Sequence, residues 1–226
     1  MKKTLLTICL VWMCFSLSAQ KIIDLSGKWS FSIDRQDNGE KEKWFSHTLN
    51  DFINLPGSMP EKLKGDEVTA KTQWTGSLYD SSYYYNPYME KYRKEGNIKF
   101  PFFLTPDKHY VGAAWYQKEV NIPADWKGER ILLFLERPHI ETTVWVNGQK
   151  TGMQNSLCVP HQYDITRYVR PGKCTITIRV DNRIKEINVG PDSHSITDQT
   201  QGNWNGIVGR ICLQTTPKTY FDDIQI

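Results

Sequence analysis

Polar and apolar residues alternate along short stretches of the chain, each bounded by turn-forming residues. Residues 28–33 read Lys-Trp-Ser-Phe-Ser-Ile, and residues 175–180 read Thr-Ile-Thr-Ile-Arg-Val. A period of two places alternate side chains on opposite faces of a strand. We therefore expect two strands here, the second with Ile176, Ile178 and Val180 inward and its threonines and arginine outward.

Further strands are expected at 114–120, 131–135, 142–146 and 206–213. Ile122-Pro123 should end the first of them, and the continuous apolar run at 131–135 is typical of a sandwich core. Asn147-Gly148 is the strongest short hairpin signal in the chain. No long amphipathic helix is predicted, so the pattern indicates an all-β sandwich or jelly roll.

Residues from about 69 to 106 follow neither period and are rich in aromatic side chains. We interpret them as a long aromatic insertion with one short helix near Met89–Lys94. Loops of this length are usually functional or folded onto the body of the domain. Trp74, Tyr84 and Tyr85 are candidates for an aromatic rim over a sugar site or a contact with another domain. The alternative is that these rings pack on the sandwich.

The first residues of the chain have the pattern of a secretory signal. Lys2 and Lys3 precede a mostly apolar run from Leu5 to Leu17, followed by Ser18 and Ala19. We predict a signal peptide over 1–19, a mature chain from Gln20, and an exported, periplasmic or extracellular protein. No later stretch approaches the roughly 18 apolar residues of a membrane span.

Charge and cysteine content narrow the choice of partners. Without Lys2 and Lys3, the chain has 26 basic against 25 acidic side chains, and this near-neutral balance argues against nucleic acid. The three cysteines beyond the predicted signal are Cys158, Cys174 and Cys212. They show no metal-ligand spacing, and either one disulfide or three buried thiols would fit.

Several motifs, in order and spacing over residues 23–226, resemble the sugar-binding domain that opens family 2 glycoside hydrolases. The motifs are Leu25-Ser26-Gly27-Lys28-Trp29, Leu55-Pro56-Gly57, Ala114-Trp115-Tyr116-Gln117, Val144-Trp145-Val146-Asn147-Gly148, Tyr163-Asp164-Ile165-Thr166, Arg179-Val180-Asp181-Asn182 and Trp204-Asn205-Gly206-Ile207. The resemblance implies a galactose-binding-like jelly roll over 20–226.

In that family an immunoglobulin-like domain and a TIM barrel follow, and the barrel carries the acid/base and nucleophile glutamates. Residues 221–226 stand about where the second domain would begin. We therefore expect both downstream domains to be absent from this chain and to be its natural partners. On this interpretation no residue here is catalytic, and no cofactor is required.

The segment 194–206 is the most informative for binding, because amides and carboxylates offer directional bonds to sugar hydroxyls. In the family, the loop before the closing strand reaches the sugar. The predicted carbohydrate-binding residues are His194, Asp198, Gln201, Asn203, Trp204 and Asn205. Alternatively, Trp204 is a core residue and the two asparagines fix turns. No metal site is predicted, since the His194–Asp198 spacing means little without a helix.

Three hypotheses for function remain open. The first is the non-catalytic domain of an exported glycosidase that hydrolyses β-linked sugars. The second is a free-standing secreted carbohydrate-binding module. The third is a small enzyme, which would need two carboxyl groups about 5–5.5 Å apart, one of them held neutral.

Overall fold

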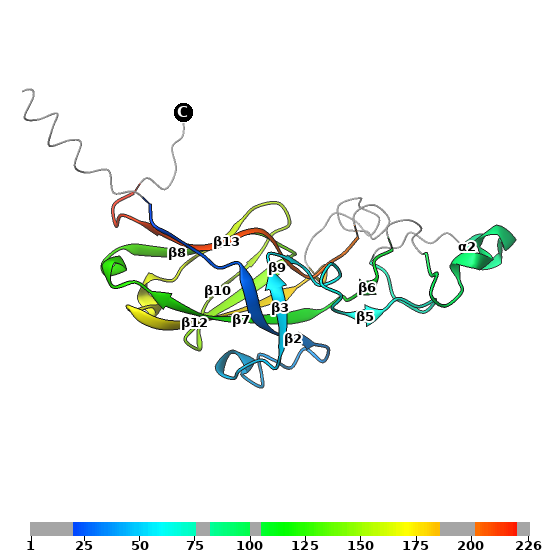
Figure 1. Cartoon of the computed structure of the whole chain (residues 1–226), viewed down its shortest axis with the longest axis horizontal. Coiled ribbons are helices and arrows are strands. Elements are labelled where there is room, and N and C mark those ends of the chain that lie inside the picture. Colours follow the sequence, from blue (N-terminus) through cyan, green and yellow to red (C-terminus); the bar gives the residue numbers. More distant parts are fainter. Residues whose placement is uncertain (1–19, 76–81, 100–104, 186–201, 221–226) are drawn as a thin grey trace, which may run out of the picture.

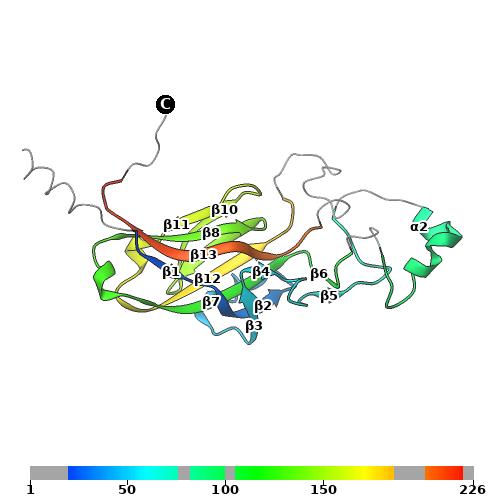
Figure 2. The ribbon, with the colours of Figure 1, turned by 45° about the horizontal axis from the view of Figure 1, so that its top comes forward.

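The computed structural model describes residues 20–75, 82–99, 105–185 and 202–220. Within these ranges the chain forms two antiparallel sheets packed face to face, with an arm that projects from one end (Figures 1 and 2). The all-β sandwich expected from the alternating stretches is confirmed.

One sheet has the order β1-β13-β8-β11, with β4 added beside β13. Its strands are β1 (Ile22–Asp24), β4 (Gly57–Ser58), β8 (Arg130–Pro138), β11 (His161–Asp164) and β13 (Gly206–Thr216). β1 pairs with the end of β13, Ile22 opposite Gln214. Both ends of the described sandwich chain therefore lie together, away from the arm (Figure 1).

The other sheet has the order β10-β9-β12-β7-β2-β3. Its strands are β2 (Gly27–Asp34), β3 (Asp51–Leu55), β7 (Ala113–Ile122), β9 (Glu141–Val146), β10 (Gln149–Asn155) and β12 (Gly172–Asp181). Asn147 and Gly148 join β9 to β10 with φ of 50° and 76°, the left-handed pair that a two-residue hairpin turn requires. Short 3₁₀ turns η1 (Trp44–Ser46), η4 (Ala124–Trp126) and η5 (Thr166–Tyr168) lie in the connections.

The main core lies between the two sheets and takes the inward residues of the alternating strands. Trp29 and Phe31 of β2 and Ile176, Ile178 and Val180 of β12 are fully buried in it. Burial of such apolar area is the main favourable term in the stability of the sandwich.

The outer face of the six-stranded sheet is also covered. Thr177 and Arg179 point away from the main core, as predicted, yet they are 1% and 7% exposed. The segment 35–50 folds over this face, and Leu49 packs there against Trp115 and Trp145 in a second apolar cluster. A period of two identifies the two faces of a strand, but it does not show that a distant loop buries the second one.

The aromatic insertion forms the arm. Its neck is a two-residue ladder between β5 (Asp66–Glu67) and β6 (Lys108–His109), and its described part holds α2 (Ser82–Tyr85) and η2 (Pro87–Tyr92). The helix expected near Met89–Lys94 corresponds to η2. Tyr83 is buried, whereas Tyr85 and Tyr88 are 72% and 85% exposed. In the described part of the arm the aromatic residues therefore divide between packing and exposure.

Candidate carbohydrate-binding site

The arm-bearing end of the sandwich gathers most of its buried polar side chains. At this end of the sandwich β2 and β12 end, and β7, β9 and β13 begin. The strand register places these ends together, because Asp34 pairs with Ala113, and Asp181 pairs with both Ala113 and Glu141. Strand ends leave backbone groups without ladder partners, and buried backbone groups need other partners. Side-chain amides meet that need here.

Asn205 ties three segments together at this end. Its Oδ1 accepts a hydrogen bond from the Tyr116 hydroxyl at 2.7 Å, and its Nδ2 donates to the carbonyls of Gly112 and Val180, each at 2.9 Å. Asn205 is fully buried. These three bonds occupy its amide with protein partners.

Asn203 and Asn182 form an interlocked pair beside it. Asn182 Nδ2 donates to Asn203 Oδ1, and Asn203 Nδ2 donates to the Asn182 carbonyl and to Thr75 Oγ1, all at 2.9 Å. Asn182 also accepts from the Gly112 amide and donates to the Tyr110 carbonyl, both at 2.8 Å. The pair fixes both the start of β7 and the chain leading into β13.

Trp204 lies between these two asparagines in the sequence and contacts the residue that follows β8. Its ring stacks on His139 with centroids 4.5 Å apart and an interplanar angle of 19°. Trp204 is half-buried. Next to it, a Cβ on Gly206 would lie 2.5 Å from the Gly57 carbonyl oxygen, so only glycine lets β13 approach β4.

A network of three cations and three carboxylates closes the outer face at the same end. Its members are Arg179, Arg183, Lys185, Asp37, Glu141 and Asp181. Burial raises the pKa of Asp181, but hydrogen bonds from Arg183 and Lys185 and the charge of Arg179 outweigh it, so this pKa lies well below 3.8. Through Asp37, the network attaches the covering segment, residues 35–50, to the end of β12.

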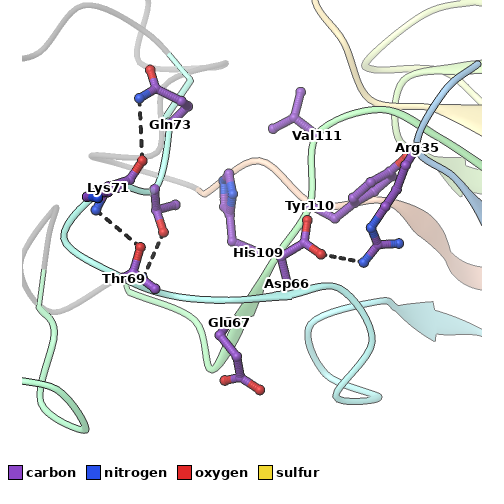
Figure 3. A pocket seen from close by; sticks show the side chains of 10 residues that line it. Arg35, Asp66, Glu67, Thr69, Lys71, Gln73, His109, Tyr110 and Val111 are labelled. Atoms are coloured by element: carbon purple, nitrogen blue, oxygen red, sulfur yellow. Dashed lines mark hydrogen bonds and ion pairs between the residues drawn. The ribbon is translucent and has the colours of Figure 1, made fainter.

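A cleft of about 470 Å³ opens where the arm meets the sandwich (Figure 3). Arg35 follows β2, Asp66 and Glu67 lie on β5, and His109 and Tyr110 stand at the end of β6. Loop residues 69 and 71–73 and Val111 complete its lining. The cleft is mostly polar, and clefts of a few hundred Å³ are the usual size for small-molecule sites.

Seven of the described carboxylates are held in the ionised form by their surroundings. A general acid must stay protonated near neutral pH, which requires a raised pKa. Each described carboxylate with a displaced pKa is displaced downward, by hydrogen bonds or nearby cations. These residues are Asp24, Asp37, Asp51, Glu61, Asp125, Asp164 and Asp181. Among the described residues, no cluster of three or more His, Cys, Asp or Glu could hold a metal ion.

Comparison with known proteins decides the family. The model of the sugar-binding domain of glycosyl hydrolases family 2 matches residues 22–217. The chain belongs to this family. The predicted resemblance is therefore confirmed, and the jelly roll described above is the fold of a family 2 sugar-binding domain.

The relatives of this family 2 domain include β-glucuronidases. The human β-glucuronidase is 25% identical over 90% of this chain and 30% of its own length. That of Paenibacillus borealis is 27% identical over 72% of this chain and 21% of its own. The chain therefore spans about 30% or less of these relatives.

Solved structures agree on the fold. An uncultured Clostridium sp. β-glucuronidase has a TM-score of 0.58 at 21% identity, and one from Ruminococcus gnavus, in complex with C6-substituted uronic isofagomine, has 0.59 at 16%. Each is matched over 89% of this chain and 30% of its own.

The predicted binding residues of this family 2 domain fall into two groups. His194, Asp198 and Gln201 lie outside the described residues. Asn203, Trp204 and Asn205 lie directly before β13, where the two asparagines bond to protein groups. The role of all six in carbohydrate binding stays a prediction. The cleft beside the arm was not predicted, because its walls come from residues about forty positions apart and no local pattern joins them.

The cysteines and the described helices complete the picture. Cys158 is exposed, and Cys174 and Cys212 are buried; all three are free thiols. Burial raises the pKa of the Cys174 thiol to about 11, as expected for a packed and unreactive side chain. In the described part of the chain no helix has the length and apolar character to cross a membrane.

Proposed function

We propose that this chain is the non-catalytic, carbohydrate-binding domain of an exported family 2 glycoside hydrolase that acts on β-linked glycans, with β-glucuronides as the first candidates. The observation that carries the proposal is the family match over residues 22–217. The names of the relatives favour glucuronides.

The electrostatics of the described carboxylates support a binding role. The buried Asp181 is held ionised by two arginines and a lysine, and Asp164 is tied to its own turn by Thr166 and to Arg130. Such carboxylates stabilise structure, and neither retains the proton that a glycosidase acid transfers. On this proposal the parent enzyme's chemistry belongs to its barrel.

Export rests on the pattern of the first nineteen residues, and we propose that the mature protein acts in the periplasm or outside the cell. A free-standing secreted module is the second candidate. The cleft at the base of the arm favours it, because a module that works alone needs a preformed site on its own surface.

The test is calorimetry of the purified chain with methyl β-glycosides, with hydrolysis of aryl β-glycosides followed in the same samples. We expect binding of at least one glycoside without turnover. Turnover that is abolished by changing one carboxylate would contradict the non-catalytic assignment. Absence of binding to every glycoside would contradict a sugar-binding role for the chain by itself.

A further inference from the structure

The cleft at the base of the arm has a rigid floor. Tyr110 and His109 are each 6% exposed. The Tyr110 hydroxyl donates to the Ala113 carbonyl at 2.9 Å, and its own carbonyl accepts from Asn182 at 2.8 Å. Because these bonds are made within the protein, the fold itself fixes the floor of the cleft, which lowers the entropic cost of binding.

The walls of the cleft carry both donors and acceptors. Gln73 is an exposed amide in the loop, and its bond to the described residues is a long 3.4 Å contact from its Nε2 to the Lys71 carbonyl. Arg35 and Asp66 are joined by an ion pair on another side of the cleft (Figure 3). Val111 is the exposed apolar side chain of the lining. A wall of this composition suits a polyhydroxylated ligand, because hydroxyls both donate and accept, and it suits an apolar ligand poorly.

The lining has two cations, Arg35 and Lys71, and two carboxylates, Asp66 and Glu67, and with Lys108, which pairs with Glu67, the cations exceed the carboxylates by one. Arg35 pairs with Asp66, and Glu67 pairs with Lys108 just behind the wall. Lys71 has no ion partner among the described residues. A carboxylate on the ligand would neutralise this excess through a charge-assisted hydrogen bond, which is stronger than a neutral one.

We propose that this cleft binds an acidic pyranoside, a glycoside of a uronic acid, with its hydroxyls on Gln73 and the neighbouring polar groups and its carboxylate on Lys71. The inference rests on the proposed sugar-binding function and assigns that function a place. Of the residues predicted at 194–205, the three that the structure describes, Asn203, Trp204 and Asn205, do not line the cleft.

The experiment is calorimetry of the chain with methyl β-glucuronide and methyl β-glucoside, using Gln73→Ala and Lys71→Ala. The matched controls are Gln149→Ala and Lys41→Ala, which change exposed residues outside the cleft. We expect Gln73→Ala to weaken both glycosides about fivefold, the value of one hydrogen bond. Lys71→Ala should weaken the glucuronide about fivefold and leave the glucoside within about twofold, and the controls should bind as the original chain does.

Amide chemical shifts measured during the same titrations keep the test independent of any folding defect. Shifts centred on residues 71–73 and 111 of the unsubstituted chain support the cleft. Binding that leaves those amides unmoved, or that survives both substitutions, overturns the cleft and leaves the proposed function standing. If the unsubstituted chain binds neither glycoside, the cleft proposal is overturned, and the proposed function is overturned as well only if the chain binds no other methyl β-glycoside.

Discussion

At the scale of single residues, two asparagines explain how the arm-bearing end holds together. The sequence predicts Asn203 and Asn205 as binding residues because amides form hydrogen bonds with sugar hydroxyls, and the alternative is that they fix turns. In the structure each amide bonds to backbone and side chains of other segments. The sequence shows that polar side chains stand near the end of a strand. Whether such a side chain forms hydrogen bonds with a ligand or with the protein depends on segments that are distant in the chain.

Replacing Asn205 should therefore cost stability. Asn205→Ala removes the acceptor of the Tyr116 hydroxyl and one hydrogen bond to each of the Gly112 and Val180 carbonyls, and the Gly112 carbonyl keeps only its 3.4 Å bond from the Asn182 amide among the described residues. With about 1–3 kcal/mol for each buried group left unsatisfied, we expect the free energy of unfolding to fall by about 3 kcal/mol. Urea unfolding measures the loss, with the exposed Asn50→Ala as control. A loss below that of the control would contradict the structural role.

At Gly39 the constraint is the lack of space for a side chain. A Cβ there would lie 2.5 Å from Trp115 Nε1 and 2.7 Å from Asp34 Oδ2, and those two atoms are bonded to each other at 2.9 Å in the buried second cluster. Because moving either atom away would disturb this buried hydrogen bond, Gly39→Ala should destabilise the fold by about 1–3 kcal/mol.

Gly152→Ala is the matched control for this substitution, because its Cβ would meet Tyr163 only at 3.5 Å, an ordinary contact. Thermal unfolding of both variants measures the contrast. Equal midpoints for the two variants would show that the covering segment moves aside easily.

At the scale of elements, the sheet with two buried faces depends on charges as well as on apolar packing. The segment 35–50 covers β12 and β7, and the salt bridges from Asp37 to Arg179 and Arg183 hold one end of it. Arg179 is buried on that face, so its charge needs the surrounding carboxylates.

The network makes stability depend on pH in a defined direction. The pKa of Asp181 lies below its ordinary 3.8 in the folded state, so its contribution is fully present above pH 3.8 and is lost as the pH falls through the folded pKa. Asp181→Asn should cost about 3 kcal/mol at pH 7, as for a broken buried pair. The difference between the two proteins should narrow below about pH 4, and chemical unfolding at pH 7, 5 and 3 measures it. A difference that is constant down to pH 3 would contradict this account.

The strands themselves were largely predictable, and the connections were not. Hydrophobic period and the Asn147-Gly148 turn locate β2, β7, β9 and β12, because each is a local consequence of side-chain alternation. Contacts between residues far apart in sequence produce the other features, which are the burial of Thr177 under segment 35–50, the walls of the cleft and the neck of the arm. The same holds for the predicted site, where the amides of Asn203 and Asn205 bond within the protein and Trp204 stacks on His139.

At the scale of the whole molecule, the two ends of the sandwich are built differently. The described chain enters and leaves the sandwich at one end through the pairing of β1 with β13, while the arm projects from the other (Figure 2). The cleft and the hydrogen bonds of Asn182, Asn203 and Asn205 lie at that second end.

The narrow neck of the arm has a consequence for how this domain can be altered. Glu67 and Lys108 are directly paired across antiparallel strands, so a two-residue Asn-Gly turn could close the hairpin in place of residues 68–107. Of the described arm residues, Thr75 bonds to Asn203 and Trp74 packs on His109. Because the register across the neck is set by the ladder itself, we expect that the length and sequence of the arm can change, or be exchanged between related proteins, with loss of these contacts but without a change in the strand register of the sandwich.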